Sequence, residues 1–247
     1  RGARRRYDDG SPTPRDPAMT PEMLSGALRV YAIVGDPVAQ VKSPAGVTQA
    51  LRARGHDAIV VPFRLPPAGL RAFFAGLQAA RNVDGATATV PHKFAARDLC
   101  ARVSERARFL GAVNAMRRTP DGAWEGNMFD GLGYVTGMRQ HGCDPRGKRV
   151  LLVGAGGAGT AMAHALVETG VATLAIHDES ASRRNALVTR LAALDTARVE
   201  AGGPDPAGVD VVLNATPAGM RARDPLPVDT TRLTAAMFVG DVVTAPV

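Results

Sequence analysis

The chain has 247 residues, of which 45% are hydrophobic, so it is long enough to bury the cores of one large or two ordinary globular domains. We find no apolar run near the roughly 18 to 20 residues that a membrane-spanning helix needs, and no pattern typical of a secretory signal, so no membrane is expected as a partner. The net charge of +7 comes from arginines spread along the chain, which argues against nucleic acid as a partner. Cys100 and Cys143, far apart in sequence, predict free thiols in a reducing cytoplasm.

The first 28 residues combine an arginine cluster, acidic residues and prolines, without apolar periodicity. Such a segment buries too little apolar surface to offset the entropy of ordering, so we predict a disordered tail over 1–28. From Arg29 onward, strand-like runs alternate with helical patterns. The runs lie at 30–34, 57–63 and 84–90. This alternation is typical of βαβ units and predicts a first α/β domain over 29–135.

A second α/β domain is predicted beyond a connecting region. Residues 111–131 are typical of a hairpin, and a connecting helix is expected from Asp130 to about Gly142. From Arg149 onward, strand and helix patterns alternate again. The strands are expected at 149–153, 173–178 and 209–216. We therefore predict a Rossmann-type dinucleotide-binding domain over 136–247.

The strongest single motif opens this second domain. Gly154, Gly156 and Gly159 stand in G-x-G-x-x-G spacing between an apolar strand and an amphipathic helix. Such glycines allow a tight turn, the approach of a pyrophosphate and close packing of helix on strand, and the helix N-terminus adds free N–H groups. We predict a dinucleotide site here, which includes Gly157; a purely structural glycine turn is the alternative.

An acidic pair, Asp178 and Glu179, follows the glycine loop by about 20 residues. Dinucleotide enzymes place there the residue that binds the adenosine ribose, and a carboxylate accepts hydrogen bonds from a ribose diol but repels a 2′-phosphate. We therefore predict NAD as the cofactor with Asp178 as its ribose ligand, and NADP as the second choice. Arg183 and Arg184 could favour NADP by binding its 2′-phosphate, but their attraction for the phosphate would have to exceed the repulsion by Asp178 and Glu179.

Lysine is scarce in this chain, and one of its lysines follows the third predicted strand in the segment GATATVPHK. The carboxyl ends of strands in an α/β sheet face the binding crevice, so Thr89 and Lys93 are expected there. Pro91 ends the strand, and Lys93 begins the next helix. A solvated lysine on a first helical turn is the alternative interpretation.

Six short segments together resemble the shikimate dehydrogenases and their quinate-using relatives, from about Tyr31 to Pro246. They are VGDPVAQVKSP, GATATVPHK, GAVNA, FDGLG, GAGGAG and NATPAGM, in the family's order and spacing. The resemblance implies that Lys93 is the catalytic acid/base and Asp130 its orienting partner, in an N-terminal substrate-binding domain. It further implies that the substrate is bound by Ser43, Thr89 and Asn114. Additional cofactor contacts are implied for Thr216 and Met220.

The chain departs from the family's pattern at several polar positions. Val41 stands where a serine is usual, Thr87 and Ala88 where asparagine and valine are, and Thr244 where a tyrosine is. Met128 and Phe129 replace asparagine and threonine, and they are candidates for pocket walls. We therefore expect a pocket retuned for another polyol or a less hydroxylated ring. The resemblance also implies a substrate-contacting glutamine beyond Pro246, so the chain is expected to be a fragment or to lack a tail.

These observations predict an oxidoreductase that transfers hydride between a nicotinamide cofactor and a ring hydroxyl or ketone of shikimate, quinate or a related cyclic hydroxy acid. It is expected in the cytoplasm, as a monomer or homodimer, with a role in aromatic amino acid biosynthesis. The histidines show no metal-ligand spacing, so no metal is predicted, and His92 is expected to have no direct role. The alternative is a non-catalytic sensor that binds a ligand or dinucleotide on the same fold.

Overall fold

The computed structural model describes residues 25–243. The predicted tail, apart from residues 25–28, and Thr244 lie outside the described residues. Residues 25–28 form a turn that leads into the first strand, and Leu28 is buried. Within 25–243, no helix has both the length and the apolar character that a membrane crossing requires.

The first half of the chain forms a six-stranded sheet in the order β2-β1-β3-β5-β6-β4. Its strands are β1 (Arg29–Gly35), β2 (Ala58–Arg64), β3 (Val83–Ala88), β4 (Arg102–Val103), β5 (Ala115–Arg118) and β6 (Trp124–Asn127). Its helical segments are α1 (Ser43–Arg52), η2 (Pro67–Gly69), α2 (Leu70–Ala79), α3 (Lys93–Arg97) and α4 (Glu105–Leu110). β1 pairs in parallel with β2 and β3, whereas β5 and β6 form the predicted antiparallel hairpin.

The second half forms a five-stranded parallel sheet in the order β11-β10-β7-β8-β9. Its strands are β7 (Arg149–Val153), β8 (Thr173–His177), β9 (Arg198–Ala201), β10 (Val211–Asn214) and β11 (Phe238–Asp241). Its helical segments are α6 (Gly157–Thr169), α7 (Ala181–Ala192) and η3 (Thr230–Arg232). The chain leaves β7 in one direction toward β8 and returns on its other side as β10, so the strand order reverses at β7. Ligands of open α/β sheets bind at such a reversal.

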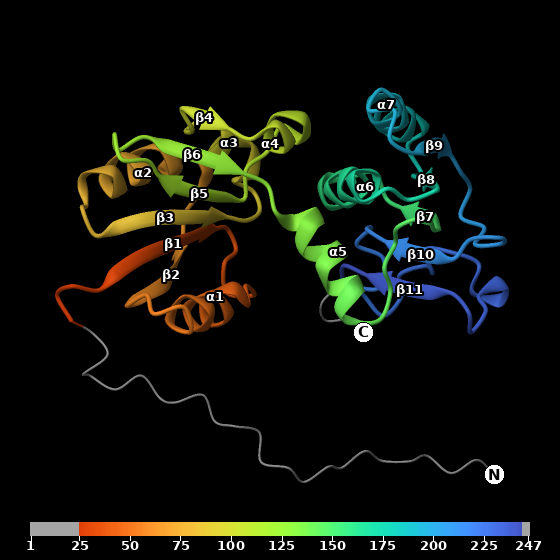
Figure 1. Cartoon of the computed structure of the whole chain (residues 1–247), viewed down its shortest axis with the longest axis horizontal. Helices are drawn as coiled ribbons and strands as arrows, with labels where there is room; N and C mark the ends of the chain where they lie inside the picture. Colours follow the sequence, from red (N-terminus) through yellow and green to blue (C-terminus); the bar gives the residue numbers. More distant parts are fainter. Residues whose placement is uncertain (1–24, 244–247) are drawn as a thin grey trace, which may run out of the picture.

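Helix α5 (Asp130–Gln140) lies between the two sheets (Figure 1). Its later residues Val135 and Met138 are buried in the core of the second unit, whereas its first residue, Asp130, faces the first unit. The α/β fold class is confirmed. The division at 135/136 stays a prediction, and α5 runs across it.

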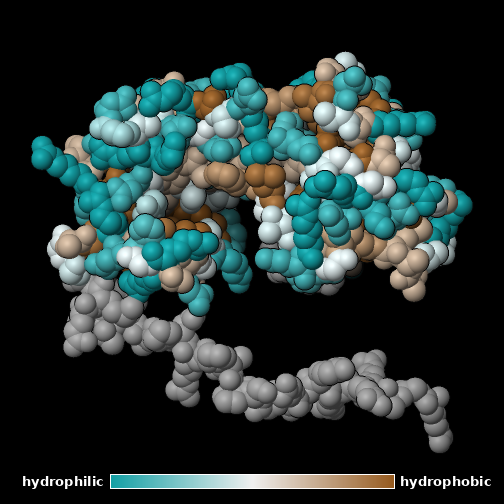
Figure 2. Space-filling view, in the orientation of Figure 1, coloured by the Kyte–Doolittle hydropathy of each residue, from teal (hydrophilic) through white to brown (hydrophobic). Residues whose placement is uncertain are grey.

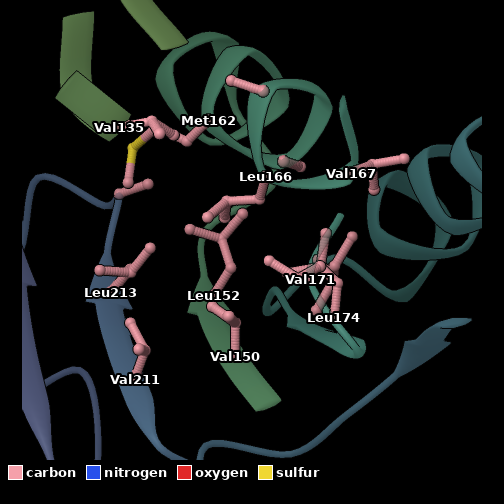
Figure 3. Close-up of a cluster of buried hydrophobic side chains, with 14 of the residues drawn as sticks. Val135, Val150, Leu152, Met162, Leu166, Val167, Val171, Leu174, Val211 and Leu213 are labelled. Atoms are coloured by element: carbon pink, nitrogen blue, oxygen red, sulfur yellow. The ribbon is translucent and has the colours of Figure 1, made fainter. Parts of the chain in front are cut away.

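The two cores follow from the apolar strand patterns. Val150 and Leu152 of β7 pack with Leu166 of α6, and Figure 3 shows this cluster. Strands of a parallel sheet are buried on both faces, which explains the nearly continuous apolar run in β7. In the first unit, Phe74 and Trp124 meet edge to face with ring centroids 5.5 Å apart.

Figure 2 shows a hollow between the two units.

Candidate active site

Lys93 is the first residue of α3, and backbone hydrogen bonds fix its position. The loop before it is tied to β1, because the Thr89 N–H donates to Val34 O at 2.9 Å. The Lys93 carbonyl accepts from the Val113 N–H at 2.9 Å. The lysine therefore stands at the carboxyl edge of the sheet, on a segment anchored at both sides.

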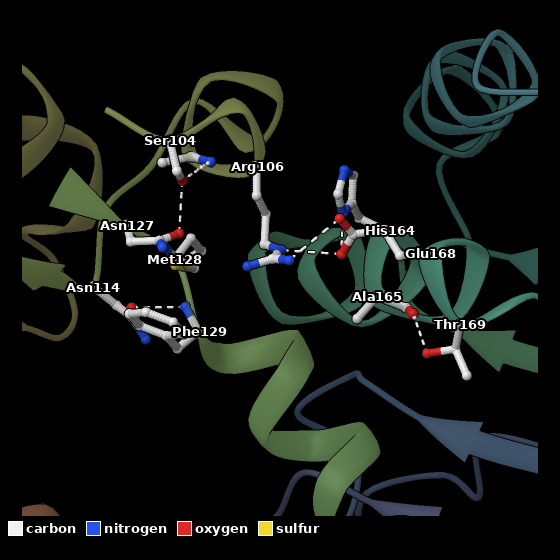
Figure 4. Close-up of polar contacts among 11 residues, drawn as sticks. Ser104, Arg106, Asn114, Asn127, Met128, Phe129, His164, Ala165, Glu168 and Thr169 are labelled. Atoms are coloured by element: carbon white, nitrogen blue, oxygen red, sulfur yellow. Dashed lines mark hydrogen bonds and ion pairs between the residues drawn. The ribbon is translucent and has the colours of Figure 1, made fainter. Parts of the chain in front are cut away.

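Three predicted residues meet around one carboxylate. Lys93 Nζ donates to Asp130 Oδ2 at 2.5 Å, and Asn114 Nδ2 donates to Asp130 Oδ1 at 2.5 Å. Asn114 Oδ1 in turn accepts from the Phe129 N–H at 2.9 Å (Figure 4). The Lys93 and Asp130 side chains keep 26% and 36% of their surface exposed, so the pair is open to a ligand. The arrangement offers an amine for proton transfer and a carboxylate held in one orientation.

The other predicted substrate residues lie on neighbouring loops. Ser43 begins α1, in the loop region after β1, and is partly exposed. Thr89 follows β3 and crosses close to the end of β1, since a Cβ added at Gly35 would lie 2.5 Å from Thr89 Cγ2. Among residues 25–243, no hydrogen bond or ion pair joins these two residues to Lys93, Asn114 or Asp130. Their part in substrate binding stays a prediction.

The residues that depart from the family's pattern differ in burial. Met128 is 4% exposed and packs in the first core, whereas Phe129 is 46% exposed. That Met128 and Phe129 line a pocket stays a prediction, and the burial of Met128 in the first core favours this role for Phe129 rather than for Met128. Val41 is partly buried, and the Thr87 hydroxyl is buried without a hydrogen-bond partner.

His92 anchors the segment before Lys93 in a way that the sequence did not indicate. Its side chain is buried, and Nε2 lies 2.8 Å from the carbonyl oxygen of Leu65, at the end of β2. This contact joins the loop after β2 to the residue directly before Lys93. The two residues are 27 positions apart, so no local pattern marks the pair.

The glycine loop has the close approaches that its spacing predicts. Gly154 has φ +105°, and a Cβ added at Gly159 would lie 1.8 Å from the Gly154 carbonyl oxygen. A Cβ added at Gly156 or Gly157 would meet nothing within 4 Å, so the start of α6 is open to a ligand. The free N–H groups of a helix N-terminus favour phosphate, and these residues fit a dinucleotide.

Asp178 follows β8, but its carboxylate has several partners within the protein. Oδ2 accepts from the Ala155 N–H at 2.7 Å, and Oδ1 accepts from the Ser180 N–H at 2.9 Å and from Arg183 Nε at 3.2 Å. Burial by itself raises the pKa of Asp178, but the two backbone N–H groups and Arg183 together lower it. The ionised carboxylate is thus held against the glycine loop.

The loop after β10 carries the remaining predicted cofactor residues. Asn214 Oδ1 accepts from the Thr216 hydroxyl at 2.6 Å, and Asn214 Nδ2 donates to the Asp241 carboxylate at 3.1 Å. These bonds stiffen the carboxyl ends of β10 and β11 beside the glycine loop. Met220 lies farther along this loop and is 55% exposed. No group of three or more potential metal ligands occurs among residues 25–243.

A polar and aromatic contact joins the two units. Arg106 of α4 donates to Glu168 of α6 at 3.0 Å, and Nδ1 of the buried His164 lies 3.3 Å from the same carboxylate (Figure 4). Arg190 of α7 lies over the ring of Phe109, 4.7 Å from its centroid. Side chains from three helices therefore join the two units on this side.

Comparisons with known proteins agree on one family. Residues 33–116 match the model of the shikimate dehydrogenase substrate binding domain. The shikimate dehydrogenase (NADP(+)) of Rubrobacter xylanophilus is 36% identical over 233 residues, which cover 92% of this chain and 81% of that protein. Quinate dehydrogenase from Corynebacterium glutamicum, solved with NAD, is 32% identical with a TM-score of 0.73, covering 87% of this chain and 80% of that one. The ligand-free 5-ketofructose reductase of Gluconobacter sp. strain CHM43 is 29% identical with a TM-score of 0.76, covering 87% and 79%.

Proposed function

This chain belongs to the shikimate dehydrogenase family, and from that premise we propose that it transfers hydride between a nicotinamide cofactor and a ring hydroxyl or ketone of shikimate, quinate or a related cyclic hydroxy acid. The observation that carries the proposal is the hydrogen bond of 2.5 Å between Lys93 Nζ and Asp130 Oδ2 at the sheet edge. We propose that the first unit, 29–135, binds the substrate and the second, 136–247, the cofactor. We predict a monomer or homodimer acting in the cytoplasm.

Lys93 is proposed as the proton acceptor in the oxidation. Its neutral amine takes the proton of the substrate hydroxyl as the carbon that bears it loses a hydride, so the C–O bond becomes a carbonyl. A nicotinamide cofactor held with its pyrophosphate at the glycine loop would supply the hydride acceptor. In the reverse direction the Lys93 ammonium returns the proton to the carbonyl oxygen. Asp130 orients the amine, and Asn114 holds the Asp130 carboxylate from its other oxygen.

The cofactor is proposed to be NAD in preference to NADP. Asp178 is ionised and lies beside the glycine loop, where a carboxylate binds a ribose diol and repels a 2′-phosphate. Arg183, which would otherwise favour a phosphate, is paired with Asp178. The relative from Rubrobacter is named for NADP(+), whereas the quinate dehydrogenase was solved with NAD. The proposal for this chain therefore rests on its own acidic residues.

An assay of the purified protein with shikimate and quinate, with NAD or NADP, tests the activity. Lys93→Ala should lower kcat by about 10²- to 10⁴-fold, the usual contribution of general acid–base catalysis. Lys148→Ala is the matched control, because Lys148 directly precedes β7, outside the proposed site, and its loss should leave kcat unchanged. A loss below about tenfold in Lys93→Ala would rule out Lys93 as the principal acid/base. Measured binding without cofactor reduction would favour the sensor.

A further inference from the structure

Phe129 is an exposed aromatic residue next to Asp130 in the chain. It directly precedes Asp130, its side chain is 46% exposed, and its backbone N–H donates to Asn114 Oδ1 at 2.9 Å. The preceding residue, Met128, is buried in the first core, so the two side chains have different environments. In Figure 4 the ring of Phe129 lies beside the Asn114 amide. The ring therefore borders the space next to a polar group of the site.

Other large apolar side chains are exposed on the loops around this site. Val90, in the turn before Lys93, and Phe94, the second residue of α3, are 62% and 64% exposed. Met220, in the loop after β10 of the second unit, is 55% exposed. Large apolar groups are normally buried, and exposed ones next to a polar centre are typical of a ligand site. The ligand that such a site fits has polar groups for the Lys93 cluster and an apolar face for the surrounding side chains.

The hydrogen bonds of Asn114 limit what it can offer to a ligand. Its Oδ1 accepts from the Phe129 N–H, and its Nδ2 donates to Asp130 Oδ1. An amide nitrogen carries two hydrogens, so one donor is left for a substrate. The Phe129 N–H bonds Asn114 Oδ1, and the exposed Phe129 ring borders this side of the amide. A substrate with several hydroxyl groups on this side would have to leave some of them against the ring.

We infer that Phe129 is a specificity-determining residue. Its ring stacks on a C–H face of the substrate ring and occupies the position beside Asn114 where a substrate hydroxyl would otherwise lie. The inference rests on the proposed function, and it narrows the substrate to a cyclic acid that lacks a hydroxyl next to the oxidised carbon. A C–H face packs favourably on an aromatic ring, whereas a hydroxyl buried against it loses its hydrogen bonds to water.

Equilibrium binding measured by calorimetry, with NADH present so that no ligand is oxidised, tests this inference directly. The ligands are shikimate and its analogue without the hydroxyl next to the oxidised carbon, and the variants are Phe129→Thr and Phe129→Leu. The wild type should bind the analogue at least as tightly as shikimate, and Phe129→Thr should shift the ratio of the two affinities about tenfold toward shikimate. Val239→Thr is the control, because Val239 is 55% exposed on β11 and lies outside the proposed site.

Proton NMR of the bound analogue gives a readout that a merely structural role would not change. The wild type should shift the C–H signals of the ligand ring upfield, because they lie over an aromatic face, and Phe129→Leu should abolish the shift. An affinity ratio that moves less than about threefold in Phe129→Thr, with unchanged ligand shifts in Phe129→Leu, would overturn the inference.

Turnover measured on the same samples separates the two proposals. Binding ratios that shift as expected in a wild type that never reduces the cofactor would refute the proposed oxidoreductase and leave the role of Phe129 standing. Turnover that depends on Lys93, with affinity ratios unaffected by Phe129→Thr, would refute the role of Phe129 alone.

Discussion

Gly131 and Ala161 meet where α5 crosses α6, and a Cβ added at Gly131 would lie 2.0 Å from the Ala161 carbonyl oxygen. Asp130, which carries the carboxylate proposed to orient Lys93, directly precedes this contact. The position of Asp130 is therefore set from both units, through Asn114 in the first and through α6 in the second. A side chain at 131 is excluded by a backbone atom, which cannot move without shifting a helix.

Gly131→Ala is predicted to push the start of α5 away from α6. Overpacking of this kind typically destabilises a protein by about 1–3 kcal/mol. The larger effect is expected on activity, because a displacement of about 1 Å in a catalytic group can cost about 10²-fold in rate. Urea unfolding and kcat measured on the same samples provide the check.

Gly133→Ala is the matched control for this change, two residues farther along the same helix. A Cβ at Gly133 meets nothing within 4 Å, so alanine there should stabilise the helix by about 0.5–1 kcal/mol. Equal losses of activity in both variants would contradict a specific role for the contact between Gly131 and Ala161.

The local parts of the site could be predicted from the sequence, and the distant parts could not. The glycine spacing and the end of the strand before Lys93 are both recognisable from a few consecutive residues. The pairing of Lys93 with Asp130, 37 positions away, came from the family resemblance. The contact of His92 with Leu65 leaves no pattern in the chain, because it depends on how loops from different strands meet.

The exposure of individual apolar residues was also hard to predict. Met128 and Phe129 are adjacent and both apolar, yet one is buried and the other exposed. Met128 is 4% exposed because it follows the end of β6 into the core, and Phe129 is turned outward at the start of α5. Composition alone does not distinguish them, since the difference arises from the turn between strand and helix.

The ion pair between Arg106 and Glu168 is predicted to couple the two units. Both side chains are partly exposed, at 21% and 36%, so a double-mutant cycle with Arg106→Ala and Glu168→Gln should give a coupling of about 0.5–1 kcal/mol. Urea unfolding of the four proteins measures it. The control pair, Arg117 with Glu125 on the exposed hairpin, should give a coupling near zero.

His164 is predicted to make stability depend on pH in the mildly acidic range. Burial lowers the pKa of His164, Glu168 raises it, and Arg106 and Arg190 lower it further, with a net lowering. The unfolded chain then binds a proton that the folded protein does not, once the pH falls below about 6.5. The contribution of His164 to the free energy of unfolding is therefore fully present above that pH. It decreases as the pH falls toward the folded-state pKa, by at most about 1.4 kcal/mol per pH unit.

The test of the His164 prediction compares unfolding free energies between pH 5 and pH 8. His164→Gln should flatten the dependence, because glutamine does not titrate. His141→Gln is the control, since His141 is exposed at the end of α5 and its replacement should leave the slope unchanged. An equal slope in the wild type and His164→Gln would show that other groups cause the dependence.

The preference for NAD over NADP is predicted to be at least about tenfold in kcat/KM, because a carboxylate beside the ribose repels the 2′-phosphate. Asp178 also holds the Ala155 N–H and Arg183, so Asp178→Asn should act in two ways. It removes the negative charge, and it frees Arg183, 58% exposed, to approach a phosphate. The variant should therefore lower kcat/KM with NAD and raise kcat/KM with NADP, and both changes reduce the preference for NAD.

Two companion variants separate these effects. Arg183→Ala added to Asp178→Asn should remove the gain with NADP but not the loss with NAD, if the freed guanidinium binds the phosphate. Glu179→Gln is the charge-matched control, because Glu179 is exposed next to Asp178 and forms no hydrogen bond with the glycine loop in the described part of the chain; it should change the preference by much less. Initial rates over a range of both cofactors measure the effects. A wild-type protein that prefers NADP would show that the Asp178 carboxylate, held by Ala155 and Arg183, does not face the ribose.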